Sequence, residues 1–145
     1  MDPRVRHQPP DLVREVRVVL KAGSRPPRLA YEVGRLPALT ALCAGDVPDS
    51  LPYDQAGRIV EFVEDVIHSL GDGPYGCAVA ALFGTRASSR GLLLAARRRE
   101  AARELGIEVA TLIRHWERDI ISDVAVGIYA HGRSRAETNQ DLENL

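Results

Sequence analysis

Apolar residues that recur at the spacing of an α-helix are the feature that most limits how this chain can fold. The clearest example runs from about residue 54 to residue 70, where one helical face carries Ile59, Phe62, Val63, Val66, Ile67 and Leu70. The acidic residues of this segment fall on the other side. No segment alternates apolar and polar residues for long enough to predict a strand. The pattern therefore predicts an all-α fold.

Glycine and proline divide the rest of the chain into further predicted helices. Gly23 ends an N-terminal helix that follows Asp11, and Gly106 ends a helix rich in Ala and Arg. The segment from Pro74 to Phe83 is apolar on most sides, which is typical of a buried helix. We expect about six helices, at about residues 12–22, 37–44, 54–70, 74–83, 91–105 and 109–130.

The length of 145 residues fits one folded domain. We expect a flexible N-terminal arm at residues 1–10, a single helical domain at 11–130 and a polar C-terminal tail at 131–145. The predicted core includes Phe62, Val66, Leu82, Leu105, Ile113 and Trp116.

Cysteine usage and hydropathy bear on the compartment. Cys43 and Cys77 lie among apolar residues without a Cys-x-x-Cys motif, so we expect two buried, unpaired thiols in a reducing compartment. The first ten residues lack the apolar run of a signal peptide. The sequence also has no run of about 18 apolar residues, which is the length that a membrane-spanning helix needs. These features predict a cytoplasmic protein with no membrane partner.

One segment combines a helix, a tight turn and a second helix. The first helix carries the small pair Ala101 and Ala102, which would let another helix approach closely. Gly106 can adopt the left-handed conformation that a tight turn between helices needs. The exposed face of the second helix should then carry Thr111, Arg114, His115 and Arg118. Side chains of these types reach base edges and phosphates.

This segment resembles the helix-turn-helix superfamily of bacterial DNA-binding proteins. The match covers about residues 97–117, where two alanines precede Leu-Gly-hydrophobic and a Thr-hydrophobic pair follows. The resemblance implies that the second helix enters the major groove of double-stranded DNA. It implies that phosphates are contacted by Arg97, Arg98 and Arg99, and bases or backbone by Thr111, Arg114, His115 and Arg118. The wider chain is similar to small helical domains of GC-rich bacteria, and that similarity implies no activity.

Local charge favours the same interpretation. Residues 86–118 hold eight arginines and four glutamates, whereas the whole chain has a net charge of -1. A basic segment of this kind can form a surface that faces phosphates. A homodimer would present two reading helices to neighbouring half-sites.

The alternative is a non-enzymatic helical adaptor that assembles with itself or binds a larger effector protein. The near-neutral charge of the whole chain favours this alternative. In that case the three consecutive arginines would form a solvated helix face, balanced by Glu100 and Glu104 of the same helix.

Other candidate sites are weaker. Glu61, Glu64 and Asp65 share a helix face, but no His or Cys joins them at the spacing of a metal site. The loop from Gly84 to Gly91 lacks the Gly-Lys-Ser/Thr ending of a phosphate-binding loop. We therefore expect no catalytic site, no metal and no cofactor.

Overall fold

The structure, a computed structural model, describes residues 10–44 and 51–145. Within these ranges the chain forms helices and no strand, which confirms the predicted all-α single domain. The elements are α1 (Pro10–Ala22), α2 (Pro26–Leu29), the 3-10 helix η2 (Ala30–Arg35), α3 (Pro37–Ala44), α4 (Pro52–His68), α5 (Pro74–Phe83), α6 (Leu94–Leu105), α7 (Val109–Thr111), the π-helix η3 (Leu112–Trp116) and α8 (Glu117–Glu143). The arm expected at residues 1–10 lies almost entirely outside the described residues.

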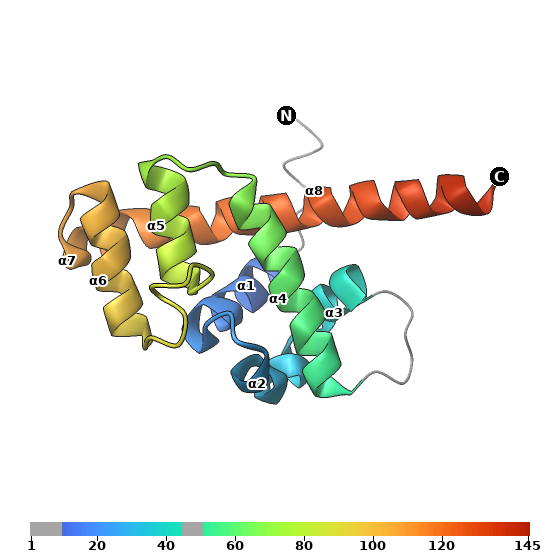
Figure 1. The fold of residues 1–145 in the computed structure, drawn as a ribbon, viewed down its shortest axis with the longest axis horizontal. Helices are drawn as coiled ribbons and strands as arrows, with labels where there is room; N and C mark the ends of the chain where they lie inside the picture. The colour runs from blue at the N-terminus through green and yellow to red at the C-terminus, as the bar shows by residue number, and fades with distance from the viewer. Residues whose placement is uncertain (1–9, 45–50) are drawn as a thin grey trace.

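Helix α4 forms the centre of the core. The predicted stripe is buried from Ile59 to Ile67, with Phe62 1% exposed, whereas Leu70 lies beyond the end of α4 and is half-buried. Helices α2, α3 and α8 and the segment η2 all pack against α4, which crosses the middle of the molecule in Figure 1. A single amphipathic helix therefore supplies the face on which most of the domain assembles.

Helices α5 and α6 form a closely packed pair at one end of the molecule (Figure 1). Most of α5 is buried, as its all-round apolar sequence predicts. The small residues Ala101 and Ala102 of α6 are also buried. Gly84 ends α5 in the left-handed conformation with φ 71°, which L-residues with a side chain rarely adopt.

Helix α8 runs the length of the molecule and continues further than the sequence predicts. We expect the last helix to end near residue 130, followed by a polar tail, but the helix continues to Glu143. Its C-terminal end projects beyond the other helices in Figure 1, and its side chains from Arg133 onward are exposed. Polarity does not end a helix, and no glycine or proline follows Gly132 to interrupt this one.

Candidate nucleic-acid interface

Helix α6 meets the following helix through the turn that the sequence predicts. Gly106 ends α6 in the left-handed conformation with φ 67°, and its N–H bonds to carbonyls of the last turn of α6. Glu108 precedes α7 and makes no side-chain capping bond. The chain thus forms helix, glycine turn and helix over residues 94–143.

The second helix contains a π-helical turn that changes which residues face the core. Because a π-helix fits extra residues into a turn, the apolar stripe shifts there by about one position. Leu112 is fully buried, whereas Ile113 is 46% exposed. The prediction that Ile113 is a core residue is therefore wrong. Leu105 and Trp116 are only half-buried at the edge of the core, while Phe62, Val66 and Leu82 are buried as predicted.

Arg97 does not lie on the surface, where a phosphate contact would need it. Its side chain is 1% exposed and its guanidinium is surrounded by main-chain carbonyls. Nη1 donates to two carbonyls, that of Leu20 at 2.7 Å and that of Leu82. Nη2 donates to the carbonyl of Lys21 at 3.2 Å, and Nε donates to the carbonyl of Leu92 at 3.0 Å. The predicted phosphate contact at Arg97 is therefore wrong: this arginine holds the C-terminal ends of α1 and α5 together.

Arg98 is also engaged inside the protein. Its Nε and Nη2 donate to the two carboxylate oxygens of Glu117 at 2.9 and 2.6 Å. Glu117 is buried at the start of α8, so this two-pronged ion pair joins α6 to α8. Arg98 is therefore poorly placed to contact DNA.

The glutamates of α6 pair with a residue outside the helix. Arg86, in the loop before α6, lies 3.3 Å from a carboxylate oxygen of Glu100 and 2.8 Å from one of Glu104. This differs from the adaptor interpretation of the sequence, which predicts Arg97–Arg99 as the partners of these glutamates. Arg86 carries one positive charge against these two carboxylates, so one negative charge of the cluster remains uncompensated on α6 beside the outward-facing arginines.

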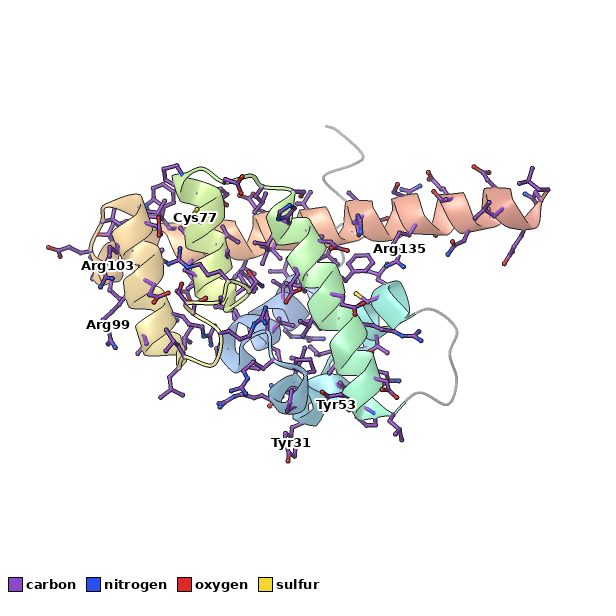
Figure 2. The ribbon with its side chains drawn as sticks, in the orientation of Figure 1. Tyr31, Tyr53, Cys77, Arg99, Arg103 and Arg135 are labelled. Carbon is purple, nitrogen blue, oxygen red and sulfur yellow. The ribbon has the colours of Figure 1, made fainter. Side chains whose placement is uncertain are left out.

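Four arginines remain exposed on α6 and on the first turns of the helix that follows it: Arg99, Arg103, Arg114 and Arg118. None of them forms an ion pair within the described part of the chain. Arg99 and Arg103 lie one turn apart and point away from the body of the molecule in Figure 2. His115 is exposed as well, whereas Thr111 is half-buried. Arg103 is the member of this set that the sequence did not single out.

The remaining polar candidates do not form a metal site among the residues described. Glu64 pairs with Arg90 at 3.5 Å, and His68 is exposed. Cys43 and Cys77 are free as predicted, but both are half-buried rather than fully buried. Burial raises the pKa of the Cys43 thiol to about 12.

No protein family, curated protein or solved structure matches the chain. Over the described ranges, no helix has the length and apolar character needed to cross a membrane. Any assignment of function therefore depends on the geometry of the surface.

Proposed function

We propose that this protein binds double-stranded DNA through the exposed arginines of α6 and of the helix that follows it. The observation that carries the proposal is the distribution of ion pairs. Arg86 and Arg98 pair with Glu100, Glu104 and Glu117, so two of these three negative charges are compensated, and the exposed arginines outnumber the charge that is left. The arginines left over therefore project a positive potential that favours phosphates.

The arrangement of the two helices supports the same proposal. The turn at Gly106 sets α6 and the next helix at an angle (Figure 1), as in a helix-turn-helix unit. On the second helix Arg114, His115 and Arg118 are exposed near its N-terminal end, which is the end that contacts bases in such units. Arg99 and Arg103 would contact the phosphate backbone, and Arg114 would reach a base edge.

The test is a titration of labelled duplex DNA at several salt concentrations. Replacing Arg99 and Arg103 with Ala should weaken binding to all sequences alike and reduce the salt slope by about 2. The matched control is Arg133→Ala with Arg135→Ala, which removes the same charge from exposed positions. Figure 2 shows Arg135 part-way along α8, far from Arg99 and Arg103. Equal loss in both double variants, or no binding by the parent protein at low salt, would contradict the proposal.

The second candidate is a module that binds protein, specifically a second copy of this chain. Tyr31 is 90% exposed and Tyr53 is 56% exposed, and Figure 2 shows both at the same end of the molecule. They belong to η2 and α4, which pack against each other. Tyrosine is enriched at protein interfaces. Sedimentation equilibrium of the parent protein and of a Tyr31→Ser, Tyr53→Ser variant tests this: a dimer that the variant loses favours self-assembly, and a monomer in both excludes it.

A further inference from the structure

A basic groove lies between α1 and the segment formed by α2 and η2, away from the arginines of the proposed DNA surface. Its volume is about 410 Å³, and it is lined by Arg14, Arg17, Val18, Lys21, Ala22, Arg28, Glu32 and Arg35. On α1 the lining residues follow the spacing of one helical stripe, and so do those on α2 and η2. Two stripes from different elements thus face each other across a concave surface.

The charges in this groove are far from balanced. Five lining side chains are cationic and one is a carboxylate. Arg14 pairs with Asp11 at 3.0 Å, and Arg35 pairs with Glu32 at 3.0 Å. Arg17, Lys21 and Arg28 have no ion pair within the described part of the chain. Three exposed cations therefore line the groove without a paired carboxylate among the described residues.

The buried guanidinium of Arg97 adds to this positive potential. Arg97 lines a small neighbouring cavity, which shares Lys21, Ala22 and Arg28 with the groove. Its hydrogen-bond partners are neutral carbonyls, so no bonded carboxylate cancels its charge. Burial, followed by repulsion from Arg28, lowers the pKa of Arg97. Arg97 and Arg28 both line the small cavity, so these two cations are neighbours beside the groove.

One polar group beside the groove is also without a partner. Ser24 is 2% exposed and lines the same small cavity as Arg97. Its hydroxyl makes no hydrogen bond within the described residues. A buried hydroxyl is normally satisfied by protein or water, so Ser24 leaves an unsatisfied donor in the small cavity next to the groove.

We propose that the groove binds a compact anion that carries two or more phosphate groups. Phosphate suits the site because guanidinium and ammonium groups bind its oxygens through short, charge-assisted hydrogen bonds. The lining has few apolar side chains, so charge rather than apolar contact would hold the ligand. The cations line a hollow from two sides, which favours a small polyphosphate over the extended backbone of DNA. The proposal is independent of the DNA surface, because the two share no residue.

The experiment is a calorimetric titration of the full chain with tripolyphosphate at low salt. Replacing Lys21 and Arg28 with Gln should weaken binding by about tenfold or more, since each loses a charge-assisted hydrogen bond. Arg133→Gln with Arg135→Gln is the matched control and should bind as the parent does. Thermal unfolding of each variant checks that the exposed substitutions leave the fold intact, and tripolyphosphate should raise the Tm of the parent more than that of the groove variant.

A parallel titration with duplex DNA distinguishes binding at this groove from binding at the proposed DNA surface. The groove variant should keep its DNA affinity to within about twofold, and the Arg99→Ala, Arg103→Ala variant should keep its affinity for tripolyphosphate. The proposal is overturned if the parent does not bind tripolyphosphate, or if the groove and control variants bind it equally. It is also overturned if the groove substitutions weaken DNA binding while tripolyphosphate does not bind.

Discussion

Replacement of Arg97 should cause a large loss of stability, although the sequence places this residue in a basic surface. Its guanidinium donates to four carbonyls that belong to three parts of the chain: the end of α1, the end of α5 and the loop before α6. The last carbonyls of a helix have no partner within the helix. Arg97 supplies that partner to two helices at once, and it packs closely against Gly84, where an added Cβ would approach its Cδ to 3.2 Å.

The size of the loss follows from these contacts. Arg97→Met fills much of the volume but leaves the carbonyls without a donor. Each buried, unpaired carbonyl costs about 1–3 kcal/mol, and some will be recovered by water or by local adjustment. A loss of about 3–5 kcal/mol is therefore expected, as when other buried polar networks are broken. Arg97→Lys should lose less, since an ammonium still donates, although it cannot match the geometry of all four carbonyls.

Urea unfolding followed by far-UV circular dichroism measures this loss. Arg99→Met is the matched control: this arginine lies two positions further along α6 and undergoes the same change, but its side chain is exposed. Its effect should stay within about 0.5 kcal/mol. If Arg97→Met lowers the free energy of unfolding by less than about 1 kcal/mol, the buried hydrogen bonds of Arg97 are not what joins α1, α5 and α6.

Three further predictions concern the core, a helix cap and a thiol. Phe62→Ala should cost about 3–5 kcal/mol in urea unfolding, because the ring is 1% exposed and lies edge-on to the His131 ring at 4.7 Å; a loss under about 1 kcal/mol would contradict its burial. Buried Glu15 accepts hydrogen bonds from the amides of Ala38 and Leu39 at the start of α3, so Glu15→Ala should cost about 1–3 kcal/mol and Glu15→Gln less; equal stability of all three proteins would refute the cap. The raised pKa of Cys43 keeps its thiol protonated, so its alkylation should remain slow in the native protein up to about pH 9, and the stability it contributes should be lost as pH rises from 9.0 to about 12; rapid native labelling of Cys43 at neutral pH would count against this.

The spacing of apolar residues predicts most of the architecture, because in an amphipathic helix these residues mark the face that is buried. Helix α5 begins at Pro74 and ends at Phe83, as the sequence predicts, and the buried stripe of α4 agrees with the sequence as well. The failures occur where local geometry departs from a regular helix. At η3 the π-helical turn buries Leu112 in place of Ile113, and a stripe counted at 3.6 residues per turn cannot anticipate that shift.

Sites formed by segments that are far apart in the chain could not be predicted from the spacing of residues in the sequence. Arg86 pairs with Glu100 and Glu104 across 14 and 18 residues, so a search for pairs four residues apart misses both contacts. The basic groove is likewise assembled from two elements, and neither stripe is unusual by itself. Its basic residues could be listed from the sequence, but only the fold shows that they face one hollow.

The three consecutive arginines of α6 have three different roles, and this follows from helix geometry. Successive residues of an α-helix point about 100° apart, so a run of identical side chains cannot share one environment. Arg97 points into the protein and bonds to helix ends, Arg98 points sideways to Glu117 of α8, and Arg99 points outward. A triple substitution would therefore remove a helix clamp and a buried ion pair together with one surface charge, and its loss of DNA binding would report unfolding. Among these three residues, only Arg99 can test the proposed DNA surface without disturbing the fold.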